Sequence, residues 1–410
     1  MINEKQHKII FAKDQNILVY AGAGTGKTFV LTQRINYLIT SKKVLKEEIL
    51  CLTFTKKAAM EMQFKLNNQV EVFTFHAFCL NTLQTCSKGQ FLLFDKNQFL
   101  FTQKELLQIA NYKNKNSSFR PQIYNSYQNY LKQNNLVDFN DLELLFLKLP
   151  PTIICVMKDK YRYIFIDEWQ DTSLVQYKII TLLTGFNTSV FCVGDPDQSL
   201  YSWRGSNKIV LKSYICDYNP RIYTLDINYR SSSTIVNLAN FIISYNKYRF
   251  PKKLIANNPE KSKIKILKFK NCDEESIFII NKIKDLMKTG LSLGDIAIIY
   301  RNNGQSITIK EKLFRSFLII KTINNNGISL LTIHQAKGLE FNIVFLIGLE
   351  KYQFPSNYAK CIHSFEEERR LLFVAITRAK DYLFITHCQK RNNTKNKPSP
   401  FLNTIAKFGI

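Results

Sequence analysis

The stretch NILVYAGAGTGKTFVLTQRINYLI (residues 16–39) holds the local pattern that decides the fold. Its apolar run NILVYA (16–21) predicts a short buried strand, and FVLTQRINYLI (29–39) predicts an amphipathic helix. Between them lies AGAGTGKT (21–28), a glycine-rich loop of the Walker A type. In such a loop backbone N–H groups surround phosphates, Lys27 reaches the β- and γ-phosphates, and Thr28 helps to hold Mg²⁺. The alternative is a glycine-rich turn with a structural role only.

Other apolar runs of strand length alternate with helical patterns along the chain. The first half contains ILCLTFT (49–55), YIFID (163–167) and SVFCVGD (189–195), and a second series begins after about residue 220. Strands that alternate with helices predict parallel sheets with crossover helices, and therefore an α/β fold. Residues 83–150 show no clear strand and are rich in Gln, Asn, Phe and Leu. We expect a helical insertion there.

The second series predicts several elements and one unusual connection. We expect strands at 264–269, 295–301, 317–322, 329–334, 343–349 and 382–387, and helices at 273–289, 307–316 and 365–379. Between two of these strands the chain reads KTINNNGISLL (321–331). Asn-Gly is a strong hairpin signal because both residues tolerate positive φ. The sequence therefore predicts a tight connection there.

The composition bounds the class of protein. The 410 residues are 45% hydrophobic, which is enough for two or three packed domains. The formal charge of +25 indicates a polyanionic partner, although a genome biased toward Lys, Asn and Ile would also raise it. The nine cysteines form no C-x-x-C pair, so we expect no zinc or iron–sulfur site and a reducing compartment. No apolar run reaches about 18 residues, so we expect no membrane span.

Two further strand ends carry chemistry. IFIDEWQD (164–171) places Asp167 where a Walker B acid holds Mg²⁺ and Glu168 where it polarises water, although the pair could instead cap a helix. VGDPDQSLYSWRGS (193–206) places Gln198 to contact a γ-phosphate or orient water. Its Tyr201, Trp203 and Arg204 suit base stacking, and a buried aromatic pair is the alternative.

Taken together, the chain resembles superfamily 1 helicases of the UvrD/Rep/PcrA type nearly end to end, with the motifs in family order. The matching segments are INEKQ (2–6, the Q motif), AGAGTGKT (I), LTFTKKAAMEM (52–62, Ia), VFTFHAFC (72–79, Ib), DEWQDTSLVQY (167–177, II), VGDPDQSLYSWRG (193–205, III), LDINYRSSSTIVNLAN (225–240, IV), LLTIHQAKGLEFNIVFLIGLE (330–350, V) and EEERRLLFVAITRAKDYLFIT (366–386, VI).

The resemblance implies two RecA-like lobes that hold one ATP and its Mg²⁺ between them. It implies lobe 1A in residues 1–82 and 151–218, a helical insertion 1B in 83–150, and lobe 2A in 219–410. The catalytic residues carried over are Lys27, Glu168, Gln198, Arg230 and Arg378, with Gln198 from the first lobe and the two arginines from the second as arginine fingers. The metal ligands are Thr28 and Asp167. The nucleotide contacts are Gln6, Ala21, Gly22, Ala23, Gly24, Thr25, Gly26, Lys27, Thr28, Phe29, Tyr229 and Glu340, with Gln6 reading adenine, Tyr229 stacking on it and Glu340 contacting the ribose.

The resemblance also implies a partner and a direction. Single-stranded DNA, or its junction with a duplex, would contact Phe54, His76, Tyr201, Trp203 and Arg204, and translocation would run 3′→5′. The basic stretch Asn246–Lys270 adds phosphate contacts or is simply a solvated edge. We expect a monomer or weak self-association. We expect the protein in the cytoplasm, associated with the nucleoid, or in an equivalent reducing compartment. An organellar or a viral origin also fits the sequence.

Three departures from the family pattern qualify these expectations. Phe29 stands where the family commonly has an arginine on adenine, and Trp169 stands where phenylalanine is usual. Only about thirty residues separate Arg301 from Leu331, so we expect no inserted 2B domain near 323–328. The leading function is an ATP-dependent helicase. The alternatives are a translocase that displaces proteins but unwinds weakly, and a nucleic-acid-binding accessory protein with impaired hydrolysis.

Overall fold

The structure is a computed structural model with two compact units. It describes residues 2–86, 92–94, 100–114, 118–200, 208–247, 249–250, 252–260, 263–321, 326–357, 359, 361–391 and 394–409. The first unit comprises Met1–Ala21, Gly26–Asp195 and Tyr201–Leu225, and the second comprises Gly22–Thr25, Pro196–Leu200 and Asp226–Ile410. The α/β fold class with parallel sheets and crossover helices is confirmed in both units.

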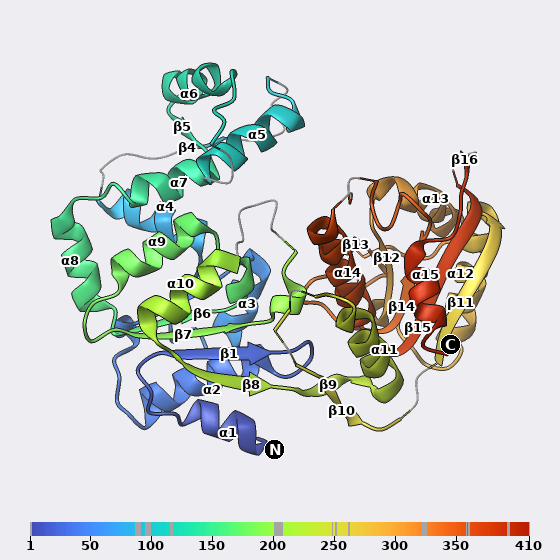
Figure 1. The fold of residues 1–410 in the computed structure, drawn as a ribbon, viewed down its shortest axis with the longest axis horizontal. Coiled ribbons are helices and arrows are strands. Elements are labelled where there is room, and N and C mark those ends of the chain that lie inside the picture. The colour runs from blue at the N-terminus through green and yellow to red at the C-terminus, as the bar shows by residue number, and fades with distance from the viewer. Residues whose placement is uncertain are drawn as a thin grey trace. The chain divides into compact units, whose positions relative to one another are not determined.

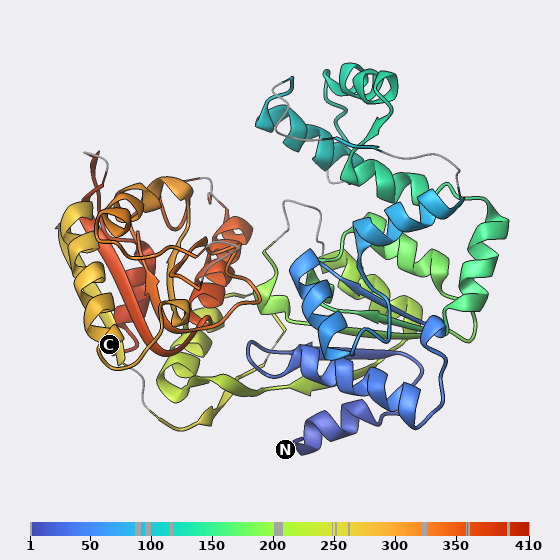
Figure 2. The same cartoon turned by 180° about the vertical axis from the view of Figure 1, so that it is seen from behind.

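The first unit is built on a six-stranded parallel sheet. Its order is β3 (Val72–Thr74), β2 (Ile49–Thr53), β6 (Tyr163–Ile166), β7 (Ser189–Gly194), β1 (Ile17–Ala21) and β8 (Arg221–Leu225). Every residue of β1 and β2 is buried, because helices cover both faces and leave no polar side to the strands. Opposite views show α9 (Leu174–Leu183) and α10 (Lys208–Tyr218) on one face, and α2 (Lys27–Thr40) and α3 (Lys56–Lys65) on the other (Figures 1 and 2). The remaining helices of this core are α1 (Glu4–Ile10), α4 (Phe75–Cys86) and α8 (Pro151–Lys160).

The strand β8 is one that the sequence pattern missed. It pairs in parallel with β1, from Ile17 opposite Arg221 to Ala21 opposite Leu225. The expected lobe boundary at residue 219 therefore falls before a strand that belongs to the first sheet. The exposed Arg221 and Ile222 give β8 the mixed composition of an edge strand, which apolar periodicity does not detect.

The expected insertion within residues 83–150 is mainly helical. It contains α5 (Gln103–Lys113), α6 (Tyr124–Gln133) and α7 (Phe139–Phe146), together with two short paired strands that the sequence did not predict, β4 (Leu92–Leu93) and β5 (Leu136–Val137). A small apolar core around Tyr127 holds it together. The buried Lys113 ammonium lies 2.7 Å from carboxylate oxygens of both Asp138 and Asp141. This ionic contact joins α5 to the start of α7.

The second unit has a parallel sheet of its own. Its order is β11 (Lys263–Asn271), β15 (Ala379–Arg391), β14 (Phe341–Leu346), β12 (Ile296–Tyr300) and β13 (Ser329–Thr332), and β16 (Thr394–Lys395) pairs antiparallel with β15. A core beneath this sheet includes α12 (Cys272–Met287) and α13 (Ile307–Arg315). The other elements are β9 (Ile227–Ser232) paired with β10 (Ile255–Asn258), and the helices α11 (Ser233–Ser244), α14 (Ile362–Ile376) and α15 (Pro400–Ala406).

The connection before β13 differs from the expected hairpin. Residues 322–325 lie outside the described part of the chain, but Gly327 does not have the positive φ that the predicted turn requires. The expected strand at 317–322 is reduced to one parallel bridge between Ile320 and Ile328. Gly327 is needed for a different reason, since a Cβ there would lie 2.4 Å from the carbonyl oxygen of Ile319. The Lys321 N–H donates to the Ile328 oxygen at 2.8 Å, with six residues between them, which leaves no length for a folded domain.

Candidate functional site

The glycine-rich loop has the backbone geometry of a phosphate-binding loop. It follows the buried strand β1, and Gly26 caps the start of α2. Gly24 and Gly26 have φ of +67° and +87°, a region where residues with a side chain are strained. The first turn of α2 carries Lys27 and Thr28 and no acidic residue. The positive end of the helix therefore faces no acidic side chain in its own first turn, a geometry suited to a phosphate.

Residues of β9 contact the tip of this loop within the second unit. The Asn228 side-chain amide donates to the Ala23 oxygen at 2.7 Å, and the Tyr229 N–H donates to the Gly24 oxygen at 2.9 Å. A Cβ at Gly24 would lie 2.7 Å from the Cβ of Arg230. Gly24 is therefore required by close approach as well as by φ. The sequence analysis did not single out Asn228.

Gln6, the expected adenine reader, lies beside the glycine-rich loop. It forms a capping box with Asn3 on α1, with the Gln6 N–H donating to Asn3 Oδ1 at 2.7 Å. A Cβ added at Gly26 would lie 3.0 Å from Gln6 Nε2, so this amide sits beside the loop. The buried Arg34 of α2 donates to the carbonyl oxygens of Ile9, Ile10 and Ala12 at 2.9–3.1 Å. Arg34 thereby holds α1 against the helix that begins with Lys27, a role that sequence reasoning missed.

The two acids after β6 lie in the same unit as Lys27. The Lys27 ammonium is 3.7 Å from Glu168 Oε1, and the Asp167 N–H donates to the Leu52 oxygen at 2.9 Å. Glu168 has φ of +52° and its side chain makes no helix-capping hydrogen bond. The alternative of a capping pair is therefore wrong for Glu168. A strained backbone at this residue is the kind of cost that active sites often carry.

Gln170 connects Glu168 to the end of the neighbouring strand. Its Nε2 donates to Glu168 Oε2, and its Oε1 accepts from the Asp195 N–H at 2.8 Å. Gly194 leaves the space for this contact, because a Cβ there would lie 2.4 Å from Gln170 Oε1. Gln170 lies in the segment DEWQD (167–171), but the sequence pattern alone did not predict a role for it. Its position two residues after Glu168 was the available signal.

The segment after Asp195 is held by cations of the second unit. Gln198 was expected from the first lobe, but Pro196–Leu200 group with the second unit. The Lys337 ammonium donates to the Gln198 oxygen at 3.0 Å, and Arg370 Nε donates to the Ser199 oxygen at 3.1 Å. Contacts with residues more than 130 positions away decide this grouping, so the local sequence could not reveal it.

Two cations of the basic stretch Asn246–Lys270 pair with the carboxylate of Asp197. Arg249 Nη2 lies 2.8 Å and Lys252 Nζ 3.5 Å from Asp197 Oδ2. Burial raises the pKa of Asp197, while hydrogen bonding to Arg249 and its charge oppose that rise. These two cations neutralise a buried carboxylate. Arg249 and Lys252 therefore do not belong to a solvated edge. Their charges are paired with Asp197 and do not point to phosphate contacts.

Both predicted arginine fingers have fixed guanidinium groups. Arg230 Nε donates to Glu340 Oε2 at 2.7 Å, and its Nη1 donates to the Thr377 oxygen at 3.2 Å. Arg378 is 1% exposed and donates to the carbonyl oxygens of Val374 and Leu339 at 2.9 and 3.0 Å. Arg378 is therefore too buried to be part of a surface salt bridge. Arg230 does form an ion pair with Glu340, but the Arg230 side chain itself is only 13% exposed.

Glu340, expected at the ribose, orients Arg230 in this structure. Burial by itself would raise its pKa, but the charge of Arg230 and the hydrogen bonds and charge of Lys380, 2.8 Å away, lower the pKa of Glu340 to about 2. Glu340 is therefore a carboxylate at any ordinary pH. Of the two residues expected to stack on adenine, Tyr229 is 42% and Phe29 40% exposed, so both rings are accessible.

The expected nucleic-acid contacts are described only in part. Tyr201, Trp203 and Arg204 lie outside the described residues, so stacking and a buried aromatic pair both stay predictions. Phe54 is half-buried just after β2.

His76 Nε2 lies 3.2 Å from Glu143 Oε1, and Gln176 Nε2 donates to that same oxygen at 2.8 Å. Burial raises the pKa of Glu143 to about 7 despite the Gln176 bond.

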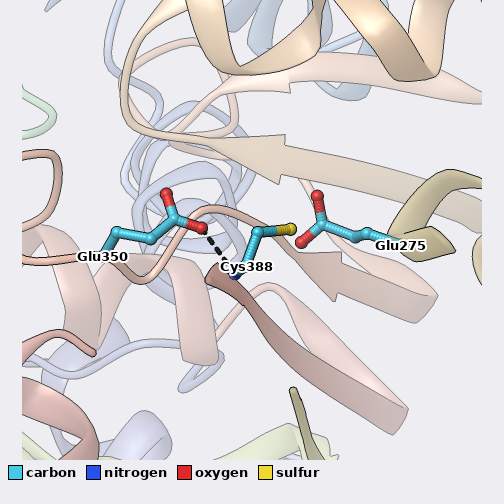
Figure 3. Close-up of side chains that lie close together, drawn as sticks. All are labelled: Glu275, Glu350 and Cys388. Atoms are coloured by element: carbon cyan, nitrogen blue, oxygen red, sulfur yellow. Dashed lines mark hydrogen bonds between the residues drawn. The ribbon is translucent and has the colours of Figure 1, made fainter. Parts of the chain in front are cut away.

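One cluster of potential metal ligands lies elsewhere in the second unit. Figure 3 shows the side chains of Glu275, Glu350 and Cys388 directed toward one another. The Arg391 guanidinium donates to Glu350 at 2.9 Å through two nitrogens and to Glu275 at 2.8 Å. Burial alone would lower the pKa of Arg391, but the two carboxylates raise it above its ordinary value. A guanidinium thus already compensates these charges, and we assign the cluster to structure rather than to a metal.

Among the described residues, no helix combines the length and the apolar character needed to cross a bilayer.

Comparison with known proteins identifies the family. A model of the UvrD/REP helicase N-terminal domain matches residues 2–92 and 86–219, and a model of the UvrD-like helicase C-terminal domain matches residues 223–326 and 316–390. A probable DNA helicase of Mycoplasma pneumoniae is 31% identical over 466 residues, covering 99% of this chain and 87% of that protein. The ATP-dependent DNA helicase PcrA of Staphylococcus aureus is 26% identical over 628 residues, covering 98% of this chain and 86% of that protein. The glycine-rich loop, the strained Glu168 and these matches along almost the whole chain lead to one conclusion: the protein belongs to the UvrD-like helicase family.

Proposed function

We propose that this protein is an ATP-dependent single-stranded DNA translocase and helicase that moves 3′→5′. The observation that carries the proposal is the pairing of Glu168 with Lys27 at 3.7 Å, where Lys27 directly follows a loop whose glycines have positive φ. A nucleotide hydrolase needs a cation on the transferring phosphate and a carboxylate beside the attacking water. Relatives named as DNA helicases support DNA as the partner.

Each residue of the nucleotide site has a task in this proposal. The amides of residues 22–27 and the Lys27 ammonium bind the phosphates of ATP, while Gln6 reads adenine. Glu168 accepts a proton from the attacking water, and Gln198 orients that water. Mg²⁺ held by Thr28 and Asp167 would neutralise charge on the β- and γ-phosphates. Arg230 and Arg378 act on charge that develops on the transferring phosphoryl group, which needs the planar guanidinium.

The strand contacts carry the mechanical part of the proposal. Phe54, His76, Tyr201, Trp203 and Arg204 bind a single strand, with the rings stacking on bases and the cations neutralising phosphates. Stacking tolerates any sequence, which a motor requires. The net charge of +25 supports a polyanionic track. The 3′→5′ direction and the preference for single strands and their junctions with duplex rest on the family resemblance.

ATPase measurements with and without single-stranded DNA test the motor. We expect stimulation by the strand, and no stimulation would contradict a translocase. Lys27→Ala should abolish hydrolysis and leave binding of the strand unchanged, because Lys27 contacts phosphate rather than DNA. Normal hydrolysis by this variant would show that the site is assigned wrongly.

Tailed duplexes test direction and unwinding. We expect strand separation with a 3′ tail and little with a 5′ tail. Stimulated hydrolysis without separation of either duplex would favour a translocase that only displaces proteins. The presence of Lys27, Asp167, Glu168, Arg230 and Arg378 disfavours the third possibility, an accessory protein with impaired hydrolysis.

A further inference from the structure

The helix α13 and the residues that follow it expose an unusual set of apolar side chains. Phe314 is 81% exposed and Phe317 is 94% exposed, while Ile307 and Ile319 are each about half exposed. The helix is held to the fold by its opposite side, where Ile309 and Leu313 are buried in the core with α12. The exposed rings therefore add nothing to the packing of the unit.

Phe317 is also strained. It follows the helix cap Ser316 and has φ of +56°. Helices commonly end with a residue in this left-handed conformation, and glycine is favoured there because it has no Cβ. A bulky residue at this φ is an outlier. The chain thus places a phenylalanine where folding favours glycine, and it leaves the ring in solvent. Strain of this kind points to a role in binding rather than in stability.

Cations alternate with these rings. Lys310, Arg315 and Lys321 are exposed along the same segment, and Glu311 is its one acidic residue. Lys312 is occupied with Asp273 at 2.7 Å. Exposed rings interleaved with cations match the chemistry of an unpaired strand, whose bases stack and whose phosphates are neutralised. An apolar protein surface would gain nothing from the three cations, and a base-paired duplex hides the faces of its bases.

We propose that Phe314 and Phe317, with Lys310, Arg315 and Lys321, form a second binding site for single-stranded nucleic acid on the second unit. We call this set the α13 surface. It is separate from the strand contacts of the proposed function, which involve Phe54 and His76 of the first unit. The two matched parts of the family's C-terminal domain overlap at residues 316–326, and Phe317 and Lys321 lie in that overlap. Its binding needs no hydrolysis.

Substitution of Phe317 separates a binding role from a structural one. Phe317→Gly removes the ring and relieves the strained φ, so the variant should be more thermostable than the parent. Its affinity for a fluorescein-labelled oligo-dT strand, measured by anisotropy without ATP, should fall about tenfold, as expected for the loss of one base stack. Phe314→Ala should weaken binding by a similar factor. Because Phe317→Gly gains stability, misfolding cannot account for weaker binding.

Phe186 provides the matched control. It is 96% exposed in the first unit and does not have a positive φ, so Phe186→Ala should leave affinity for the strand unchanged. Equal affinity of the Phe317→Gly, Phe314→Ala and parent proteins would overturn the proposal. Two other results would overturn it in favour of another occupant: an equal loss on a blunt duplex, or a parent dimer in sedimentation that Phe317→Gly abolishes. If the variants bind oligo-dT as expected but the protein does not hydrolyse ATP, the proposed motor function is rejected. The proposal of a binding site at the α13 surface then still holds.

Discussion

Gln170→Met tests whether the bridge between Glu168 and Asp195 positions the catalytic carboxylate. Methionine has nearly the length of glutamine but cannot donate to Glu168 Oε2 and is only a weak acceptor for the Asp195 N–H. The Glu168 backbone is strained at φ +52°, so the side chain depends on its partners for its orientation. Without Gln170 we expect Glu168 to leave the position in which it polarises water.

The size of the effect follows from the kind of bond. A hydrogen bond to a charged group contributes about 1.5–3 kcal/mol. If that energy is lost from the transition state, kcat for ATP falls by roughly 10- to 150-fold. KM for ATP should change by no more than about threefold, because a group that acts in the transition state contributes little to ground-state binding.

The assay is steady-state ATP hydrolysis with saturating single-stranded DNA. Gln176→Met is the matched control, since Gln176 is a glutamine of the same unit whose side chain binds Ser173 and Glu143 rather than Glu168. It should lower the thermal midpoint and leave kcat unchanged. If Gln170→Met keeps kcat within twofold of the parent, or if both variants lose kcat equally, the bridge does not position Glu168.

Two further predictions concern stability. Arg391→Met leaves the buried Glu275 and Glu350 without their cation, so the free energy of unfolding in urea should fall by roughly 3–5 kcal/mol. The more exposed pair Arg162–Glu48 is the control. Arg162→Met should lower that free energy by less than about 1 kcal/mol. Similar losses of unfolding free energy in the two variants would show that Arg391 does not stabilise the fold by pairing with Glu275 and Glu350. Burial raises the pKa of Glu143 from its ordinary 4.5 to about 7, so the folded state holds this proton more tightly than the unfolded state does, and the free energy of unfolding falls as pH rises from 4.5 to 7. Glu143→Gln should remove that part of the slope in urea unfolding at a series of pH values, and parallel profiles for parent and variant would contradict the assignment.

The segments with strong local patterns could be predicted from the sequence. Strands β1, β2, β6 and β7 are buried on both faces and therefore read as continuous apolar runs. The helices α12 and α14 follow the helical period within a few residues of the expected bounds. The edge strand β8 has no such pattern. The positive φ expected at Gly327 is also not found, since Ile320 and Ile328 form a parallel bridge there instead of a hairpin.

The sequence by itself determined the chemistry of this protein. The loop AGAGTGKT and the acids Asp167 and Glu168 are short, local patterns, and such patterns state what a segment can bind. The tertiary structure alone decided which partners hold these groups. Gln170 joins Glu168 to Asp195, Glu340 holds Arg230, and Arg249 neutralises Asp197. The physical reason is that Gln170 and Asp195, Arg230 and Glu340, and Arg249 and Asp197 lie tens of residues or more apart in the chain. Their contact depends on the path of the backbone between them, which local periodicity does not describe.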